Sequence, residues 1–290
     1  RDGQLEKLKD QSQQITIISG VGGVGKTVLI KKLYDSLKDK IPFLIFKATE
    51  FELRNINDLF NDFSFYDFVM AYKNEDYKVV VVDSAEGLLD LKNTDPFKEF
   101  LLVLIKNKWK IIFTTRNNYL EQLNYQFFEI YNIVPLNINI KKLELEELSI
   151  ISNTYNFSLP KDEKLIELLR TPFYLNEYLK YYKFEEKLDY IQFKNELWNI
   201  IIKKSEPERE NSFLNIAFER ANKGCFFITP SCNKDTLIDL TKDGVLGYEE
   251  AGYFITHDIY EEWALEKIIY REFINKDNNE RFFNRIGNSL

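Results

Sequence analysis

Residues 20–27, GVGGVGKT, decide the fold class of this chain. They fit the pattern G-x-x-x-x-G-K-[ST], in which glycines allow the backbone to wrap its N–H groups around a phosphate. The pattern follows an apolar run at residues 15–19 and precedes a helical pattern at residues 26–37. This is the strand–loop–helix context that the motif requires, so the sequence predicts a P-loop with the positive end of the following helix directed at the phosphates.

The predicted loop supplies a set of nucleotide contacts. Lys26 is expected to reach the β- and γ-phosphates, and the hydroxyl of Thr27 is expected to ligate Mg²⁺. The residues expected to enclose the nucleotide are Gly20, Val21, Gly22, Gly23, Val24, Gly25, Lys26, Thr27 and Val28. The expected cofactors are Mg²⁺ and ATP or ADP, and GTP remains an alternative nucleotide.

The first half of the chain alternates short β-like runs with helical patterns, which is typical of a parallel α/β sheet. We predict strands at residues 15–19, 42–47, 79–83, 110–114 and 127–134, and a helix at residues 97–106. The four consecutive valines at residues 79–82 have the composition of a strand that is buried on both faces. The fold class is therefore α/β, a P-loop NTPase sheet.

The pattern changes after Pro135. Residues 137–195 have helical periodicity and no convincing strand, and the charged residues 205–211 are expected to form a linker. Helices near residues 212–222 and 235–242, a hairpin at 246–256 and a helix at 258–274 then suggest a winged-helix domain. Three domains are predicted: a nucleotide-binding α/β domain (1–136), a helical domain (137–205) and a winged-helix domain (206–290).

Three charged residues follow predicted strands and are candidates for catalysis. Asp83 ends the valine strand, where its carboxylate is expected to hold Mg²⁺ or a water bound to it. Glu86 is a candidate for orienting or deprotonating the attacking water. Arg116 follows the strand at residues 110–114, and ligands bind at the carboxyl edge of parallel sheets, so it is a candidate for contacting the γ-phosphate. The catalytic set is Lys26, Asp83, Glu86 and Arg116, with Thr27 and Asp83 at the metal.

Charge and composition argue against several other classes. The net charge is −7 with a pI near 5.1, so no general field attracts nucleic acid or an anionic membrane. No apolar run is long enough to span a bilayer. Two cysteines and a single histidine provide neither a disulfide framework nor a structural zinc site. We expect a cytoplasmic protein without a membrane partner.

Taken in order, these segments resemble the STAND class of P-loop ATPases, which includes NACHT and NB-ARC proteins. The N-terminal Arg1-Asp2 resembles the end of the arginine-plus-acid motif that precedes the P-loop strand. DSAE at residues 83–86 is similar to the NACHT-type second motif, although Gly87 stands where a further acid is common. TTR at residues 114–116 resembles the sensor motif of the class.

Two further motifs belong to the second half of the chain. TPFYL at residues 171–175 is similar to the adenine-side proline motif, which assigns Pro172 to the nucleotide. FITHD at residues 254–258 resembles the winged-helix histidine motif, in which the histidine, here His257, contacts the β-phosphate of ADP. Thr256 stands where that motif usually has Met. The alternative for His257 is that it only packs at the base of the hairpin. The sequence of the motif at residues 254–258 is most similar to that of bacterial antiviral STAND proteins of the Avs type.

The resemblance implies a nucleotide-gated switch in antiviral defence. ADP would hold the module closed by bridging the α/β domain and His257, and ATP would support homo-oligomerisation after activation. The trigger, a foreign protein, would be sensed by a region outside residues 1–290, and an effector domain would precede them. Hydrolysis would be slow, because it serves the switch.

Two alternatives from other classes remain. The first is an ATP-dependent winged-helix transcription regulator, but residues 206–290 carry 10 Lys and Arg against 16 Asp and Glu, a net charge of −6. A DNA-binding domain is expected to be basic, which argues against nucleic acid as a partner of this module. The second is an AAA+ motor. It ranks lower because no second acid directly follows Asp83 and Arg170 is the sole candidate for a sensor arginine in the helical segment.

Overall fold

The computed structural model describes residues 2–10, 13–60, 62–182, 187–204, 206–223, 225, 227–249, 252–275 and 278–286. The chain divides into two compact units, Arg1–Lys141 (unit 1) and Lys142–Leu290 (unit 2). No helix in the described ranges is long and apolar enough to cross a membrane.

Unit 1 is built on a five-stranded parallel sheet, as predicted. Its strands are β1 (Ile15–Gly20), β2 (Phe43–Lys47), β3 (Val79–Asp83), β4 (Lys110–Thr115) and β5 (Leu136–Ile140). Their order in the sheet is β2-β3-β4-β1-β5. All six residues of β1 and of β4 are buried, as expected for central strands that are covered on both faces.

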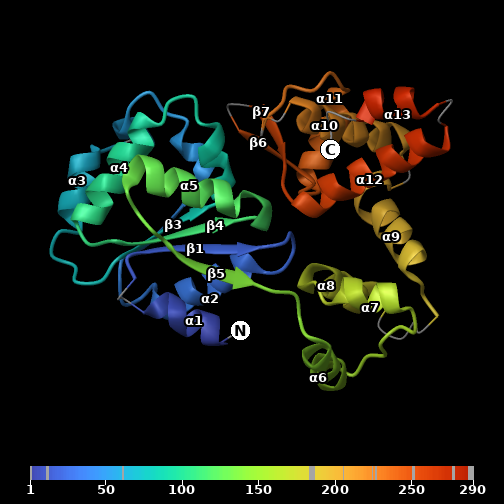
Figure 1. Cartoon of the computed structure of the whole chain (residues 1–290), viewed down its shortest axis with the longest axis horizontal. Helices are drawn as coiled ribbons and strands as arrows, with labels where there is room; N and C mark the ends of the chain where they lie inside the picture. Colours follow the sequence, from blue (N-terminus) through green and yellow to red (C-terminus); the bar gives the residue numbers. More distant parts are fainter. Residues whose placement is uncertain are drawn as a thin grey trace. The chain divides into compact units, whose positions relative to one another are not determined.

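Helices cover both faces of this sheet (Figure 1). The helices α1 (Asp2–Lys9) and α2 (Lys26–Leu37) pack on the face that carries Ile18, Val79 and Val81. The helices α3 (Phe65–Ala71), α4 (Asp95–Lys106) and α5 (Leu120–Tyr131) pack on the opposite face, which carries Ile17 and Val82. Alternate residues of the central strands thus enter different cores, as expected for a sheet that is covered on both faces. Short 3-10 turns occupy Ala48–Phe51, Ile56–Leu59, Ala85–Asp90 and Asn117–Tyr119.

The prediction of a strand at residues 127–134 is wrong, and so is the predicted absence of a strand in residues 137–195. Leu123 and Phe127 are buried on one face of α5, whereas Phe128 is 54% exposed, so this apolar run follows a helical period. The fifth strand is β5, whose Ile138 and Ile140 are buried while the alternating Asn137 and Asn139 are exposed. Asparagine disfavours strands, which hid this edge strand in the sequence.

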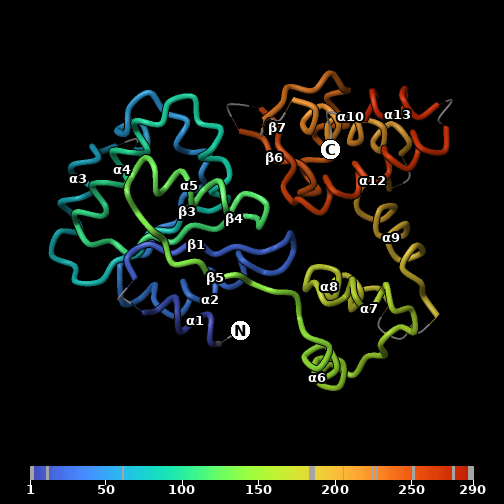
Figure 2. The backbone as a smooth tube through the Cα atoms, in the orientation of Figure 1, coloured from blue at the N-terminus to red at the C-terminus, as the bar shows by residue number. Residues whose placement is uncertain are grey.

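The described residues of unit 2 are helical apart from one hairpin and an isolated β-bridge between Ile228 and Tyr253. Its elements are α6 (Leu145–Tyr155), α7 (Glu163–Leu169), α8 (Pro172–Tyr181), α9 (Tyr190–Trp198), a π-helical turn (Asn199–Lys203), α10 (Pro207–Lys223), α11 (Lys234–Lys242), β6 (Leu246–Glu249), β7 (Gly252–Ile255), α12 (Asp258–Ile274) and α13 (Asn279–Ile286). The chain runs from α8 through α9 into α10 (Figure 2). Buried residues from α6 to α12 form one hydrophobic cluster, so these helices share a core.

The predicted hairpin and the helix after it are confirmed. β6 and β7 pair antiparallel, with Leu246 opposite Ile255, and α12 begins at Asp258. The predicted linker at residues 205–211 is wrong, because α10 begins at Pro207 and the side chain of Arg209 is only 2% exposed. Proline is accepted in the first turn of a helix, and the arginine is buried with a carboxylate partner, Asp243, at 2.6 Å. The division of unit 2 into a helical and a winged-helix domain stays a prediction.

Candidate functional site

The loop between β1 and α2 has the backbone that a phosphate cradle needs. Gly23 has φ 69° and Gly25 has φ 99°, so both lie in the left-handed region that favours glycine. A Cβ on Gly20 would lie 2.7 Å from Cγ1 of Val24 and 2.9 Å from the carbonyl oxygen of Ile140. The loop is therefore closed tightly on itself at the end of β1, and side chains at these positions would open it.

Lys26 is the first residue of α2 and folds back over this loop. Its Nζ donates hydrogen bonds to the carbonyl oxygens of Gly20 at 2.8 Å and of Val21 at 3.3 Å. Val24 is fully buried beneath the loop, whereas Val28 is 59% exposed. The ammonium group is thus held at the mouth of the loop by neutral acceptors. A phosphate oxygen is a stronger acceptor for an ammonium group than a carbonyl oxygen, because the hydrogen bond is assisted by charge on both sides.

The carboxylates of Asp83 and Glu86 are both held by hydroxyls from the end of β4. Thr114 Oγ1 donates a short hydrogen bond to Asp83 Oδ1 and accepts one from the backbone N–H of Ser84 at 3.0 Å. Thr115 Oγ1 donates to Glu86 Oε2 at 3.0 Å. Ser84 has φ 57°, which turns the chain sharply between the two acids. The carboxylates therefore lie together at the carboxyl edge of the sheet.

Arg116 joins the same group. Its Nε lies 3.4 Å from Glu86 Oε1, and the two side chains are 20% and 11% exposed. The structure thus brings together Asp83, Glu86 and Arg116, the three charged residues predicted from strand ends. Strand order connects them to the P-loop: β4 lies between β1 and β3, and Thr115 pairs with Ser19, which immediately precedes the loop.

Asn139 on β5 is a polar residue at this edge that the sequence analysis missed. Its Nδ2 donates to Ser19 Oγ at 3.0 Å and to Asn117 Oδ1 at 2.8 Å. It therefore connects the P-loop strand to the turn that follows Arg116. The signal was the alternation of Leu, Asn, Ile, Asn and Ile over β5, which a helical assignment of residues 137–195 concealed.

The residues at this edge fit a nucleotide with a hard cation. Thr27 is exposed in the first turn of α2, and Asp83 ends β3, so the side chains offer a hydroxyl and a carboxylate oxygen, which Mg²⁺ prefers. Within the described residues, no group of three or more His, Cys, Asp or Glu side chains is able to hold a metal. A cation at this edge would therefore take its other ligands from phosphate and water, as Mg²⁺ commonly does.

Unit 2 brings the surroundings of Pro172 and His257 together. Pro172 is the first residue of α8, with Thr171 as N-cap. His257 is the exposed N-cap residue of α12, and its ring centroid lies 6.3 Å from that of Phe173 and 5.3 Å from that of Tyr260. No hydrogen bond of its imidazole is found among the described residues. The two predicted nucleotide contacts of unit 2 are thus neighbours on the surface of that unit.

Thr256, which replaces the Met of the histidine motif, has a structural contact of its own. Its Oγ1 donates to the carbonyl oxygen of Val245 at 3.1 Å and ties the end of the hairpin to the turn before β6. At the other end of the chain, Arg1, the first residue of the motif before the P-loop strand, lies outside the described residues; Asp2 begins α1.

The sequence matches no protein-family model and no curated protein. The fold is similar to solved structures at low identity. A Walker-type ATPase of Pyrococcus abyssi has a TM-score of 0.47 at 15% identity, over 91% of this chain and 95% of that one. The ORC1 protein of Aeropyrum pernix, solved in complex with DNA, has a TM-score of 0.46 at 11% identity, over 94% of both chains.

The AMPPCP-bound DnaA of Aquifex aeolicus has a TM-score of 0.44 at 15% identity, over 81% of this chain and 73% of that one. All three scores lie below 0.5. The assignment of a P-loop fold therefore rests on this chain's own sheet order, glycine loop and strand-end residues.

Proposed function

We propose that the chain is an ATPase module that binds Mg²⁺·ATP and ADP at the P-loop edge of unit 1. The observation that carries this proposal is the convergence at one sheet edge of the glycine loop with Lys26, the acids Asp83 and Glu86, and Arg116. Fixed positive charge beside two ordered carboxylates is what phosphoryl transfer to water requires, because its catalysis depends on positioning and charge stabilisation.

Each of these residues has a proposed task. The loop N–H groups and Lys26 bind the β- and γ-phosphates, while Thr27 and Asp83 hold Mg²⁺. The cation, when bound, neutralises charge that develops on the phosphates. Glu86 orients and deprotonates the attacking water, and Thr115 fixes the direction of its carboxylate. Arg116 lies beside the base, where it would stabilise charge on the γ-phosphate.

We further propose that nucleotide state switches a STAND-type module. Support comes from unit 2, where the exposed His257 has neighbouring aromatic rings next to Pro172 but no hydrogen bond of its own among the described residues. An imidazole in this condition is able to donate to a phosphate. If it does so in one arrangement of the module alone, ADP favours that arrangement by the difference in affinity. ATP then supports homo-oligomerisation in antiviral defence.

Two observations weigh against the alternatives. Residues 206–290 have a net charge of −6, which disfavours a DNA-binding role. Arg170, the candidate sensor arginine of an AAA+ motor, forms ion pairs with Glu167 at 2.7 Å and Glu144 at 3.4 Å within unit 2. Its charge is thus already used to hold the start of α6 to the end of α7.

The site is tested by titrating Mg²⁺·ATP into Lys26→Ala in a calorimeter. Affinity should fall roughly a hundredfold, because a charge-assisted contact with the phosphates is lost. Lys31→Ala is the matched control, since Lys31 lies on the same helix and is exposed. If Lys26→Ala binds like Lys31→Ala, the nucleotide site lies elsewhere.

The switch is tested separately. Light scattering of the natural full-length protein should show larger assemblies with Mg²⁺·ATP and trigger than with ADP. Bacteria that express it should restrict phage, and those that express its Lys26→Ala variant should not. ATP binding without either effect would retain the ATPase and remove the defence switch.

A further inference from the structure

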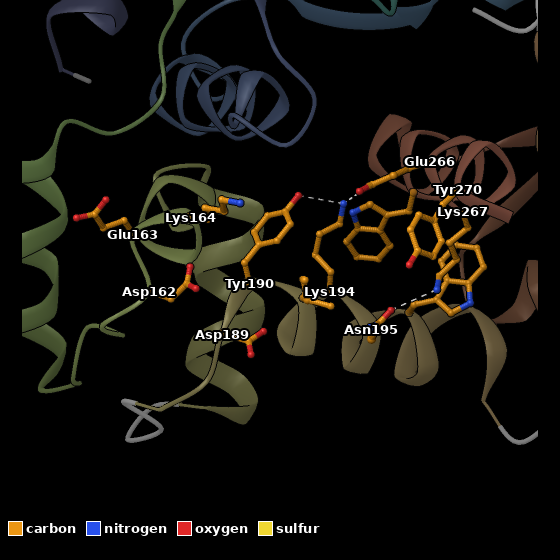
Figure 3. Close-up of a pocket in the computed structure, with 13 residues that line it drawn as sticks. Asp162, Glu163, Lys164, Asp189, Tyr190, Lys194, Asn195, Glu266, Lys267 and Tyr270 are labelled. Atoms are coloured by element: carbon orange, nitrogen blue, oxygen red, sulfur yellow. Dashed lines mark hydrogen bonds and ion pairs between the residues drawn. The ribbon is translucent and has the colours of Figure 1, made fainter. Parts of the chain in front are cut away.

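Unit 2 contains a cavity that the nucleotide proposal does not use. Its volume is about 910 Å³, and it opens between α9 and α12, with the start of α7 at one end (Figure 3). Cavities of roughly 300–1,000 Å³ are the size that proteins use for small ligands. The space lies wholly within one compact unit.

The walls of this cavity repeat one arrangement on both helices, an amine between two aromatic rings. The residues are Tyr190, Lys194 and Trp198 on α9, and Trp263, Lys267 and Tyr270 on α12. Their spacing of three or four residues places each set on a single face of its helix. The cavity is therefore lined by two parallel rows of π-surface and positive charge.

Hydrogen bonds hold the two tryptophan rings of the cavity in place. Trp198 Nε1 donates to Glu210 Oε1 at 2.7 Å, and Trp263 Nε1 donates to the hydroxyl of Tyr174 at 2.7 Å. Both indoles are almost fully buried, whereas the ring of Tyr270 is 66% exposed at the rim. A planar ligand would thus meet the tyrosine ring, and the ordered tryptophan rings would keep the shape of the cavity.

Most charges around the cavity already have partners. Lys194 pairs with Glu266 and lies 3.3 Å from the hydroxyl of Tyr190 (Figure 3). The carboxylates of Asp162 and Asp189 accept hydrogen bonds from the first turns of α7 and α9, at 2.7 and 2.8 Å. The ion pair thus joins α9 to α12, and the two aspartates cap the starts of α7 and α9.

Lys267 differs from them. Its Nζ donates to Asn195 Oδ1 at 3.4 Å and lies 5.0 Å from the centre of the Trp198 ring, but no ion pair of this lysine is found among the residues that the structure describes. An ammonium group has three donors, so two remain for a ligand. Burial holds the pKa of Lys267 below its ordinary value, and Lys194 and Lys203 lower it further against the pull of Glu210 and Glu266.

We propose that this cavity binds a small planar anion, whose charged group accepts hydrogen bonds from Lys267 and whose ring lies against Tyr270. The partly desolvated amine gains a strong, charge-assisted contact from such a ligand, and the aromatic rim provides a surface for its ring. A cavity of this size within one unit suits a small molecule better than a helix or a folded partner. The site is independent of the P-loop and does not depend on the function proposed for it.

The probe for this site is 8-anilinonaphthalene-1-sulfonate, which combines planar rings with one sulfonate. It should quench tryptophan fluorescence by energy transfer, because two of the three tryptophans line the cavity. Lys267→Met, which keeps the length of the side chain but removes its charge, should weaken binding roughly tenfold or more. Lys267→Arg should retain binding, which keeps the test decisive if the methionine variant does not fold.

Three controls define the outcomes. Arg271→Gln removes the same charge one turn further along α12, at an exposed position that does not line the cavity, and should leave affinity unchanged. The neutral probe N-phenyl-1-naphthylamine should bind wild type and Lys267→Met equally. Lys26→Ala should bind the sulfonate probe like wild type. The proposal is overturned if Lys267→Met binds normally, if Arg271→Gln is as weak as Lys267→Met, if the neutral probe is lost equally, or if Lys26→Ala abolishes binding.

Discussion

Units 1 and 2 place their polar groups in different ways. In unit 1 the polar groups that form the candidate site gather where buried strands end, as Asp83 and Thr115 do. In unit 2 charged side chains form ion pairs between helices, such as Arg209 with Asp243 and Lys194 with Glu266. A strand end exposes its side chains to a ligand, whereas a paired charge between helices mainly fixes packing.

The difference teaches how far a local motif determines function. The residues of the P-loop are consecutive, and Asp83 and Glu86 are three residues apart. The functional groups of unit 1 therefore lie in short segments that a sequence motif identifies. Lys194 and Glu266 are 72 residues apart, and the sequence around one residue does not predict its pairing with the other. Functional groups in unit 2 are therefore visible only after folding, with the exception of motifs such as the one around His257.

The comparison is tested first at the catalytic edge, where the largest effect is expected. Glu86→Gln keeps the shape of the side chain and its hydrogen bond from Thr115 but removes the base. ATP hydrolysis should fall by a factor of about 10²–10⁴, the usual contribution of a positioned base, while ATP still binds. Single-turnover hydrolysis and calorimetry measure the two quantities.

Glu99→Gln is the control for that experiment, because Glu99 is exposed on α4. It should hydrolyse ATP like wild type. Equal rates in both variants would show that Glu86 is not the base, and the chemistry would then have to be sought outside the carboxyl edge of β3.

His257→Ala tests whether unit 2 also contributes to the nucleotide. If the imidazole donates to a phosphate of ADP, its loss removes a hydrogen bond to a charged group, about 1.5–3 kcal/mol. ADP should then dissociate roughly ten- to a hundredfold faster. Phe173→Leu, a neighbour of the ring, serves as the packing control. A lower melting temperature with an unchanged ADP off-rate would assign His257 to packing alone.

Asp243→Asn tests the ion pairs of unit 2. Burial raises the pKa of Asp243, but Lys204 and Arg209 outweigh it and hold this pKa below the usual 3.8. Arg209 is 2% exposed, so losing its partner should lower the free energy of unfolding by about 2 kcal/mol at pH 7. This stability is present above pH 3.8 and is lost as the pH falls through the lower folded-state pKa.

Denaturant titrations on a Trp109→Phe background measure this effect, because the remaining tryptophans, Trp198 and Trp263, both belong to unit 2. Asp239→Asn on α11 is the matched control. A loss in Asp239→Asn as large as that in Asp243→Asn would mean that the negative charge of α11 matters and the pair with Arg209 does not.

The fold of unit 1 was largely predictable, since period-2 burial and a glycine loop are properties of short segments. β5 was not, because its isoleucines alternate with asparagines and only one side of this edge strand needs apolar residues. Asn139 was missed with it. In unit 2 the charged start of α10 led to the prediction of a solvent-exposed linker, whereas Arg209 is buried. Its partner, Asp243, lies 34 residues further along the chain, and no local sequence pattern predicts this pairing.

The smallest effect is expected at the opposite, amino-terminal edge of the sheet, where unit 1 also buries a charge. Lys110 begins β4 and is 3% exposed, and its Nζ donates to the carbonyl oxygens of Gln13, at 3.0 Å, and Asp10. Burial lowers the pKa of Lys110 below 10.5, and the carboxylate of Asp10 offsets part of this. Unlike the arginine of unit 2, this cation is held mainly by neutral groups.

The sign of its pH dependence follows from proton counting. Between the folded-state pKa of Lys110 and 10.5, the unfolded chain binds more protons than the folded one, so stability rises with pH by at most about 1.4 kcal/mol per pH unit. Burial raises the pKa of Tyr131 to about 12, which lowers stability above pH 10, but this residue is present in wild type and Lys110→Met alike and cancels in their difference. Wild type should therefore gain stability relative to Lys110→Met as the pH rises towards 10.5, whereas the exposed control Lys98→Met should run parallel to wild type.

Trp109 reports this unfolding when the tryptophans of unit 2 are replaced by phenylalanine. A pH-independent difference between wild type and Lys110→Met would show that Lys110 keeps its ordinary pKa in the fold, and that its buried charge is compensated as fully as that of Arg209 in unit 2.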